Sequence, residues 1–407
     1  FLAIKGERVD GHDFIEKCFA QGAVCALCEK APENATKPCI VVSSTLDAVK
    51  KIGRAYREKF DIPVIGISGS VGKTSTKEML YAVLSQKFKT HKTQGNLNNE
   101  LGVPLTLLSM PEDTEAAVIE MGISDFGEMT RLSEMVQPTI CVLTIIGECH
   151  LENLGDRDGV LKAKTEMFKN ACENADFILN GDDDKLSTVK TVNGKKPVFF
   201  GLDAKNDFYA KNIKNSGDGK VLATLCFDNN NIDVEIPAIG TYMVTNALAA
   251  AAAGKLLGLT DEEIANGVAS YKTVGSRANV INTGKIKIID DCYNANPTSV
   301  RASLDTLSNL DGRKVAILGD MKELGSEELK LHFDTGVYAK SKDIGTVITV
   351  GELAKELAKG ADGKAFDTIE DAKPEILKTI KSGDVVLVKA SHSMQFENIV
   401  EFLKQNF

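Results

Sequence analysis

The chain has 407 residues, of which 43% are hydrophobic and 26% are charged, and this size and balance predict a globular protein of two or three domains. Its 48 basic and 57 acidic residues give a net charge of −9, with no long basic block, so a nucleic-acid partner is disfavoured. The most apolar stretch, 247–257, is Ala-rich and too short to span a bilayer, so we expect no stable membrane insertion.

The nine cysteines are scattered without regular spacing. An odd number of irregularly spaced cysteines predicts free thiols in a reducing compartment. We find no signal peptide, so we expect a cytoplasmic protein. The chain opens with Phe1-Leu-Ala-Ile4, without an initiator methionine and within an apparent strand. We therefore expect the N-terminal domain to be incomplete.

Residues 1–60 predict a small α/β domain. Apolar runs and helical periodicity indicate, in order, a strand at the start of the chain, a helix over 11–21, strands over 23–28 and 39–43, and a helix over 45–60. Strands that alternate with helices in this way are typical of parallel sheets.

Residues 61–274 predict a central domain of the same class. Pro63 opens a unit in which apolar strands alternate with helices. The segment 201–236 differs, because it is rich in Asn, Asp and Lys and carries short alternating runs that indicate hairpins at the domain's edge. The expected strands are 64–68, 116–119, 140–146 and 177–179, and the expected helices are 73–86, 246–257 and 261–269.

Residues 275–407 predict a third domain, which begins after a linker at Gly275-Ser276. Apolar strands separated by helical segments recur here, a pattern typical of a Rossmann-like fold. These strands are 286–289, 314–318, 346–350 and 385–389. The predicted fold class is therefore α/β with three domains: a small N-terminal one, a central one of the phosphate-loop ATPase type with a mostly parallel sheet, and a Rossmann-like C-terminal one.

The strongest local motif is a glycine-rich turn between the apolar strand 64–68 and a helix. Backbone N–H groups of such a turn converge on phosphate oxygens, helped by the helix N-terminus. Lys73 would neutralise the β and γ phosphates of a nucleotide, and the Thr74 hydroxyl would coordinate Mg²⁺. The strict pattern has glycine where Ile67 stands, so this loop is a shorter form. The residues predicted to bind nucleotide here are Gly69, Ser70, Val71, Gly72, Lys73, Thr74 and Ser75.

A second candidate ligand for magnesium is Glu120, which follows the apolar residues 116–119. Doubly wound sheets bind their ligands at the carboxyl ends of parallel strands, and carboxylate oxygens suit Mg²⁺. A lone glutamate at a strand end is by default an ordinary solvated acid. A phosphate loop in the same sheet favours the metal-ligand interpretation instead.

The loop form Gly69-x-x-Gly-Lys-Thr74 is shared by Mur ligases and folylpolyglutamate synthetases, and further motifs narrow the resemblance. Taken in order, they are similar to segments of the Mur ligase family, and within it to the branch that adds D-alanyl-D-alanine. The ordered series covers almost the whole chain and is highly specific. The segments are 3–13, 93–99, 119–122, 150–155, 162–168, 291–297 and 319–325.

This resemblance implies three domains that handle a UDP-sugar, ATP and the incoming amine, with a mobile C-terminal domain that closes over the last two. It implies an ATP-dependent ligase that joins D-alanyl-D-alanine to UDP-N-acetylmuramoyl-tripeptide in peptidoglycan precursor synthesis, through an acyl phosphate and a tetrahedral intermediate. It also implies a monomer. Phosphoryl transfer to a carboxylate brings two anions together, so positioning and charge neutralisation supply most of the catalysis.

The resemblance also assigns residues, position by position. His150 is similar to the family's histidine ligand of a second Mg²⁺, and Lys164 to a lysine that reacts with CO₂ to give a carbamate at the magnesium site. That reaction needs a neutral amine, which burial favours. Arg277 matches an arginine that reaches the ATP phosphates, and Asp291 a carboxylate that binds the ribose. With Lys73, His150 and Lys164 are the residues that we expect to be catalytic.

Asn246 resembles the family's adenine contact, although its expected place at the start of an Ala-rich helix also suits an N-cap. Other matched positions are candidates for holding the two substrates. Those for the UDP-tripeptide are Thr93, Asn96 and Asn99, and those for the acceptor dipeptide are Asn294, Asn296, Lys389 and Ser391.

Ser124-Asp125, Ile145, Tyr242-Met243 and His392 depart from the family pattern. His392 stands where an arginine is usual, and histidine is a weaker, titratable partner for a carboxylate. The alternatives are a divergent Mur ligase with another amine acceptor, a sister ligase that adds a single amino acid, and a catalytically silent nucleotide-binding homologue. A folylpolyglutamate synthetase would share the phosphate loop but not the opening segment.

Overall fold

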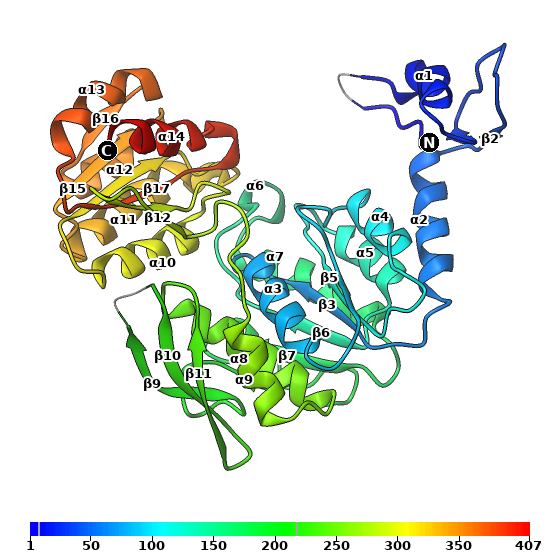
Figure 1. The fold of residues 1–407 in the computed structure, drawn as a ribbon, viewed down its shortest axis with the longest axis horizontal. Coiled ribbons are helices and arrows are strands. Elements are labelled where there is room, and N and C mark those ends of the chain that lie inside the picture. The colour runs from blue at the N-terminus through cyan, green and yellow to red at the C-terminus, as the bar shows by residue number, and fades with distance from the viewer. Residues whose placement is uncertain (7–8, 217–218) are drawn as a thin grey trace.

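The computed structural model describes residues 1–6, 9–216 and 219–407, and it has three parts (Figure 1). Each part has its own sheet, and the central part carries a further sheet of three strands. Residues 7–8, within the opening motif, and 217–218, within the expected hairpin region, lie outside the described residues. The predicted α/β class with three parts is confirmed.

The N-terminal part is small and rests on two short parallel strands. A long helix, α2, leads from it to the central part, where it packs against two central helices (Figure 1). Near the end of this helix, the buried Arg57 donates to Val136 O at 2.9 Å and joins the two parts. The elements are η1 (Gly11–Phe14), α1 (Ile15–Ala20), β1 (Ala26–Cys28), β2 (Cys39–Val41) and α2 (Thr45–Arg57).

The regular strand predicted at the start of the chain is wrong. Among the described residues, this segment makes isolated bridges, one of which joins Leu2 to Leu27. The chain soon turns back on itself, since the Gly11 amide donates to Ile4 O at 2.9 Å. This local turn leaves too few residues in a row for a strand, whatever their propensity.

The central sheet has six strands, and every neighbouring pair is parallel. β3 lies inside the sheet and is buried along its whole length, so its carboxyl end leads directly into the phosphate loop. β6 ends at Leu143, before the predicted residue 146, because the chain there turns to meet the loop. In sheet order the strands are β4 (Thr90–Lys92), β5 (Ala116–Glu120), β3 (Val64–Ser68), β6 (Ile140–Leu143), β7 (Asp176–Asn180) and β8 (Val198–Phe200).

The helix predicted to open at Asn246 begins one turn earlier, at Tyr242, with Thr241 as the N-cap residue. No residue between them breaks a helix, so the Ala-rich run extends backwards. Asn246 is therefore inside α8 and buried, and its alternative role as an N-cap is wrong. The helices of the central part are α3 (Lys73–Leu84), α4 (Gly102–Leu108), α5 (Glu128–Val136), α6 (Leu151–Leu154), α7 (Arg157–Thr165), η2 (Glu166–Asn170), η3 (Leu186–Thr188), α8 (Tyr242–Leu256) and α9 (Asp261–Ala269).

The predicted hairpin region is confirmed as a three-stranded antiparallel sheet of β9 (Tyr209–Asn215), β10 (Val221–Phe227) and β11 (Asn230–Ile236). Its inner side chains share one core with the alanines of α8 and with the helix α3. The small sheet thus covers the helix pair that lies behind the phosphate loop (Figure 1).

The C-terminal sheet has six strands, parallel except for the edge strand β12, which pairs antiparallel with β13. Sequence patterns did not predict β12, because this short strand begins and ends with asparagine and so lacks a clear apolar run. In sheet order the strands are β12 (Asn279–Asn282), β13 (Lys287–Asp290), β17 (Val385–Lys389), β14 (Lys314–Gly319), β15 (Thr346–Val350) and β16 (Lys364–Phe366). The helices are α10 (Pro297–Ser308), η4 (Gly325–Glu327), α11 (Glu328–Ser341), α12 (Ala354–Ala361), α13 (Ile369–Thr379), η5 (His392–Met394) and α14 (Glu397–Asn406).

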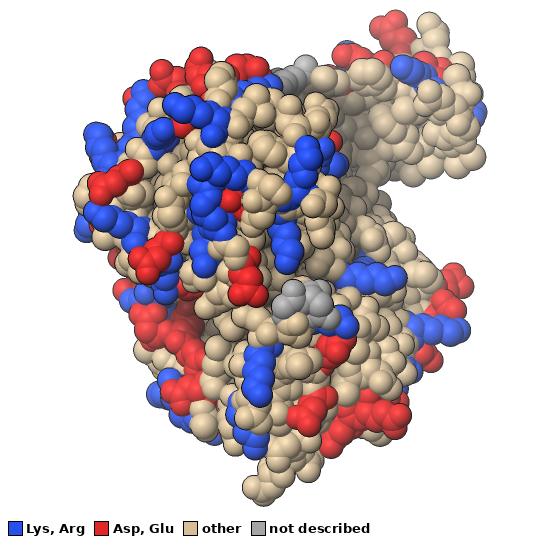
Figure 2. Space-filling model, turned by 60° about the vertical axis from the view of Figure 1, so that its left-hand side comes forward, with Lys and Arg blue, Asp and Glu red and all other residues tan. Residues whose placement is uncertain are grey.

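The surface mixes both signs of charge: Figure 2 shows acidic and basic side chains interspersed over the face that it presents. All nine cysteines are free thiols, as their spacing predicted. Every helix among the described residues is too short or too polar to cross a bilayer.

Candidate active site

The phosphate loop follows β3 and depends on two glycines. Gly69 has a φ of +148° and Gly72 a φ of +84°, which are values that favour glycine. A Cβ atom at Gly69 would lie 2.0 Å from Thr144 Oγ1, so this position has no room for a side chain. Gly72 is the N-cap residue of α3, and the loop's amides therefore adjoin a helix N-terminus, as in phosphate-binding sites.

The loop is fastened to the chain that follows β6. The Ser70 amide donates to Ile145 O at 2.7 Å, and Cys149 Sγ donates to Ser70 Oγ at 3.0 Å. Thr144 Oγ1 donates to Val71 O at 2.6 Å. Ile145 supplies only its carbonyl to this contact, so its departure from the family pattern leaves the bond intact.

Lys73 is the first residue of α3, and its side chain bends back over the loop, where Nζ donates to Gly69 O at 2.8 Å. Part of the side chain is accessible, but the dense protein around it lowers the pKa of Lys73 by desolvation, against the Glu120 carboxylate, which raises it. Arg277, from the C-terminal part, lies within electrostatic range of Lys73. Two cations and the loop amides thus face one region, which suits a polyphosphate.

Thr74 and Glu120 meet at the carboxyl end of the central sheet. Thr74 Oγ1 donates to Glu120 Oε2 at 2.8 Å, and Asn98 Nδ2 donates to Glu120 Oε1 at 2.8 Å. Thr74 and Glu120 are both buried. A hydroxyl and a carboxylate side by side next to a phosphate loop fit a Mg²⁺ ion that takes its remaining ligands from nucleotide and water.

A buried network of ion pairs lies beside Glu120. Lys77 Nζ is 3.1 Å from Glu78 Oε1 and 3.8 Å from Glu120 Oε2, and it donates to Thr93 O at 2.8 Å. Glu78 also pairs with Lys92. Lys77 is 1% exposed, so the three acceptors around it compensate a charge that has left water.

Lys164 lies near the end of α7 and is 1% exposed. Burial lowers the pKa of its ammonium to about 8, and Lys73 contributes in the same direction. Cys149, which bonds to the phosphate loop, lies within electrostatic range of Lys164. A neutral amine therefore forms at a pH where an ordinary lysine is charged, and this fits the chemistry of carbamate formation.

His150 precedes α6 and has a left-handed φ of +52°. Its Nδ1 lies 2.5 Å from Oε2 of Glu323, in the C-terminal part. Nδ1 has no hydrogen-bond partner by geometry, so this is a close contact between an imidazole and a carboxylate. A second polar contact between these parts lies close by, where Thr298 Oγ1 donates to Glu148 Oε2 at 2.6 Å.

Asn246 approaches the phosphate loop from α8. Its Oδ1 accepts from Thr76 Oγ1 at 3.0 Å, and a Cβ atom at Gly72 would lie 3.6 Å from that oxygen. Ser75, on α3, lies beside Tyr271, and a hydrogen bond between them opposes the burial that raises the pKa of Tyr271. Both residues are thus part of the packing around the loop.

Arg277 leads into the C-terminal part, and its guanidinium carbon lies 3.6 Å from the centre of the Tyr293 ring, which is a cation–π contact. Asp291 Oδ2 accepts from Lys389 Nζ and from Ser303 Oγ, both at 2.6 Å. The carboxylate of Asp291 is therefore held by its own part of the chain in this conformation.

The acceptor candidates gather at the carboxyl ends of the C-terminal strands. Lys389 Nζ donates to Asn294 O at 2.9 Å, and Ser391 Oγ accepts from a backbone amide at 2.9 Å. Asn296 is the N-cap of α10, where its Oδ1 accepts from the Ser299 amide at 2.8 Å. That bond occupies the Asn296 side chain with a structural role.

The candidates for the UDP-tripeptide lie between β4 and α4. Thr93 is buried, and its Oγ1 accepts from the Glu120 amide at 2.9 Å. Asn99 Oδ1 accepts from the Gly102 amide at 2.8 Å. Asn96 is exposed. Thr93 thus fixes the end of β5, whereas Asn96 presents its side chain to solvent.

The structure gathers the predicted residues into two groups. The first surrounds the phosphate loop, and the second lies on the C-terminal strands; Arg277 reaches from the second part towards the first. No three His, Cys, Asp or Glu side chains converge as a metal cluster within the described ranges. The first group is Lys73, Thr74, Thr93, Glu120, Lys164 and Asn246, and the second is Asp291, Asn294, Asn296, Lys389 and Ser391.

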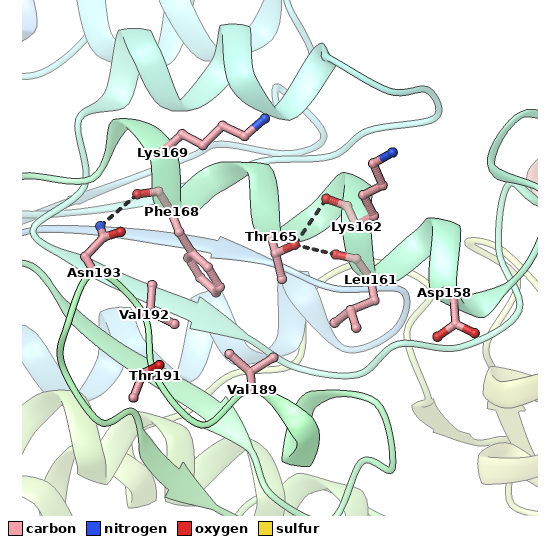
Figure 3. A pocket seen from close by; sticks show the side chains of 10 residues that line it. All are labelled: Asp158, Leu161, Lys162, Thr165, Phe168, Lys169, Val189, Thr191, Val192 and Asn193. Carbon is pink, nitrogen blue, oxygen red and sulfur yellow. Dashed lines mark hydrogen bonds between the residues drawn. The ribbon is translucent and has the colours of Figure 1, made fainter.

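A surface hollow of about 580 Å³ lies elsewhere, between α7, η2 and the segment 189–193 (Figure 3). Two of its polar side chains donate to backbone carbonyls of its own lining: Thr165 Oγ1 to Leu161 O at 2.8 Å, and Asn193 Nδ2 to Phe168 O at 3.1 Å. None of the predicted site residues lines it, so we do not assign the reaction to this hollow.

Sequence reasoning did not single out Lys77, Asn98 or Glu323. Asn98 and Glu323 lie within the motifs 93–99 and 319–325, but nothing in a motif says which of its side chains contacts Glu120 or His150. Lys77 follows Lys73 by one helical turn and therefore shares its face, which is the signal that could have found it.

Fold and site together define a three-part α/β protein with a phosphate loop in its central sheet. Family models match along the chain: "Mur ligase family, catalytic domain" over residues 1–68, "Mur ligase middle domain" over 67–254, and "Mur ligase, glutamate ligase domain" over 276–392. The chain belongs to the Mur ligase family.

Two relatives are named UDP-N-acetylmuramoyl-tripeptide–D-alanyl-D-alanine ligase. The Bacillus subtilis protein is 38% identical, with 99% of this chain and 90% of the relative covered, and the Escherichia coli protein is 35% identical, with 100% and 91% covered. The crystal structure of MurF from Acinetobacter baumannii is similar with a TM-score of 0.93 and 33% identity, covering 100% of this chain and 90% of that one. MurF from Thermotoga maritima in complex with ADP has a TM-score of 0.90 and 31% identity, covering 100% and 94%.

Proposed function

We propose that this chain is an ATP-dependent ligase that joins D-alanyl-D-alanine to UDP-N-acetylmuramoyl-tripeptide. The observation that carries the proposal is the phosphate loop with Lys73 above it and the Thr74–Glu120 pair beside it. The names of relatives that align over nearly the whole chain supply the substrates.

In the proposed reaction, a carboxylate oxygen of the tripeptide attacks the γ-phosphorus of ATP, and ADP leaves. The amine of the dipeptide then attacks the acyl phosphate, and the tetrahedral intermediate collapses to an amide and inorganic phosphate. Lys73 and Arg277 neutralise the phosphates during the first step, when two anions approach one another. Loop amides hold the phosphates in line.

Two Mg²⁺ ions complete the proposal, because bound Mg²⁺ would neutralise the charge of the phosphates. Thr74 and Glu120 would hold the first ion, and the donors present, a hydroxyl and a carboxylate, suit this hard cation. His150 would contribute to the second. Among the described residues, Nδ1 of His150 makes the close contact with Glu323 Oε2, so Nε2 would be the atom that binds the ion.

Lys164 is proposed to carry a carbamate formed with CO₂ at the magnesium site. Support comes from its full burial and from a pKa of about 8, which together supply the neutral amine that the modification requires. A carbamate is an anion, so it would also offset the positive charge of Lys73 nearby.

The remaining proposed binding residues are divided among the nucleotide, the UDP-tripeptide and the dipeptide. The nucleotide would lie between the phosphate loop, Asn246, Arg277 and Asp291, and the UDP-tripeptide near Thr93, Asn96 and Asn99. We propose domain boundaries near residues 60 and 274, a monomer, and a cytoplasmic location, which nine free thiols support. The dipeptide would lie near Asn294, Asn296, Lys389 and Ser391.

A second candidate is a ligase of the same mechanism with another amine acceptor. The observation that favours it is His392, whose side chain is 75% exposed and lies 3.6 Å from Glu397 Oε1 at Nδ1. A histidine beside a carboxylate binds an acceptor's carboxylate more weakly than a bidentate arginine does. An acceptor with a different C-terminus is therefore worth testing.

The experiment is phosphate release from ATP with UDP-N-acetylmuramoyl-tripeptide, with and without D-alanyl-D-alanine, followed by mass analysis of the product. Dipeptide-dependent release with a pentapeptide product is the expected result. Release that requires a single amino acid or a depsipeptide would move the assignment to the second candidate. No release with any acceptor would overturn the ligase function.

A further inference from the structure

Metal-binding histidines commonly need a second partner. When one ring nitrogen binds a metal ion, the other usually bonds to a carboxylate or a carbonyl, which fixes the orientation of the ring. In the part of the chain that the structure describes, His150 has one close polar neighbour, Glu323, which reaches Nδ1 at 2.5 Å.

Glu323 comes from the C-terminal part and His150 from the central part, so the contact depends on how the two parts are placed. Both residues of this contact have an uncommon backbone conformation. His150 has a φ of +52° and Glu323 a φ of +65°, and non-glycine residues in this region store strain that is typical of functional sites.

The residues on either side of Glu323 are held in place by a hydrogen bond and by packing. The Met321 amide donates to His332 Nε2 at 2.9 Å, and the buried Leu324 anchors the next residue. A Cβ atom at Gly325 would lie 3.3 Å from the Glu152 backbone, so this turn lies directly against α6. The carboxylate therefore meets His150 from a fixed turn and not from a free loop.

We propose that Glu323 is a positioning residue for His150: placement of the C-terminal part brings its carboxylate to Nδ1 and leaves Nε2 to bind Mg²⁺. This deepens the proposed function and rests on His150 as a metal ligand. Its consequence is that the second metal site is complete only while the C-terminal part is docked. Metal binding and domain placement are thereby coupled through one contact between an imidazole and a carboxylate.

The test uses Mn²⁺ in place of Mg²⁺, with ADP and the full chain, because Mn²⁺ accepts oxygen and imidazole ligands and reports a bound imidazole nitrogen by pulsed EPR. Wild type should show the nitrogen signal, and His150→Ala should lose it. Glu323→Ala should weaken Mn²⁺ binding by about tenfold or more, the size of effect expected for the partner of a metal-bound histidine.

Two control variants separate positioning from other effects. Glu327→Ala removes an exposed carboxylate from the adjoining turn and should bind Mn²⁺ as wild type does. Thr298→Val removes the neighbouring contact with Glu148 between the same two parts and should leave Mn²⁺ affinity near that of wild type. If Thr298→Val weakens binding as much as Glu323→Ala, Glu323 acts only in docking, and the inference is overturned.

Failure of this inference is distinguishable from failure of the proposed function. Unchanged Mn²⁺ affinity in Glu323→Ala would overturn the positioning role while dipeptide-dependent phosphate release persists. Absence of the nitrogen signal in an active wild-type enzyme would overturn it as well, and would remove His150 from the metal site. Loss of the ligase function itself would appear in the phosphate-release assay, which does not depend on the EPR signal.

Discussion

Thr74 Oγ1 donates a 2.8 Å hydrogen bond to Glu120 Oε2, and this bond joins the first turn of α3 to the end of β5. Both side chains are buried, and Asn98 holds the other carboxylate oxygen. A magnesium ion that binds here would replace this hydrogen bond, and the Thr74 hydroxyl and the Glu120 carboxylate would already be in place as its ligands. The pair therefore joins the phosphate loop to the carboxyl end of β5, where we propose that Mg²⁺ binds.

Lys73→Ala should reduce turnover by about 10³-fold or more, because loss of a cation at the transferring phosphate removes several kcal/mol of transition-state stabilisation. The fold should remain intact, since among the described residues the hydrogen bond of Lys73 Nζ is to the loop carbonyl of Gly69. Steady-state kinetics and circular dichroism measure the two effects. Lys89→Ala, which removes an exposed lysine paired with Asp113, is the matched control, and near-normal turnover in Lys73→Ala would refute the phosphate-loop assignment.

Gly69→Ala should destabilise the protein and abolish ADP binding, because the new Cβ would lie 2.0 Å from Thr144 Oγ1. Gly194→Ala isolates the backbone contribution, since Gly194 also has a positive φ, +80°, but has open space around it; it should cost about 1 kcal/mol. Thermal unfolding and ADP titration compare the two. Equal destabilisation would mean that the contact with Thr144 relaxes freely.

Lys77→Met should destabilise the fold by about 3–5 kcal/mol, because it leaves the buried carboxylates of Glu78 and Glu120 without their shared cation. Urea unfolding measures the change. Adding Glu78→Gln should recover part of the loss, and the double-mutant cycle then gives the coupling between the two side chains. A strictly additive cycle would show that the pair does not interact.

Lys164 gives a pH prediction whose sign is fixed by burial. Its pKa falls from 10.5 to about 8 on folding, so the unfolded chain binds more protons and stability rises with pH between these values. Below pH 8 the full cost is about 3 kcal/mol. In CO₂-free buffer, Lys164→Met should therefore be more stable than wild type at pH 7, and the gap should close towards pH 10.5.

The same variant tests the carbamate. Bicarbonate should stabilise wild type and restore the activity of a CO₂-depleted preparation, and it should do neither in Lys164→Met, which should be inactive. Denaturation curves at fixed pH, with and without bicarbonate, separate this effect from general salt effects. A fully active Lys164→Met enzyme would exclude the carbamate role.

Sequence patterns predicted the strands β3, β15 and β17 to the residue, because each is a compact apolar run between turns. They failed where few residues carry the signal. The strand expected at the start of the chain is cut short by the turn that the Gly11 amide closes, and β12 lies at a sheet edge with polar ends.

The site divides in a similar way. Gly69, Lys73 and Thr74 lie within six consecutive residues, so their spacing alone predicts a phosphate loop that leads into a helix. The contact of His150 with Glu323 joins residues far apart in sequence, and it depends on how two separately folded parts meet. Asn246 lies inside α8 and not at its start. Its hydrogen bond with Thr76 joins α8 to α3, which are far apart in the sequence, so no local pattern indicates it.

The most direct test of the central claim follows an oxygen atom. UDP-N-acetylmuramoyl-tripeptide labelled with ¹⁸O in its terminal carboxylate is incubated with ATP, Mg²⁺ and D-alanyl-D-alanine, and the released phosphate is analysed by mass spectrometry. If the carboxylate attacks the γ-phosphorus and the amine then displaces phosphate, each phosphate carries one ¹⁸O atom from the substrate. Unlabelled phosphate, formed together with the pentapeptide product, would contradict the acyl-phosphate route.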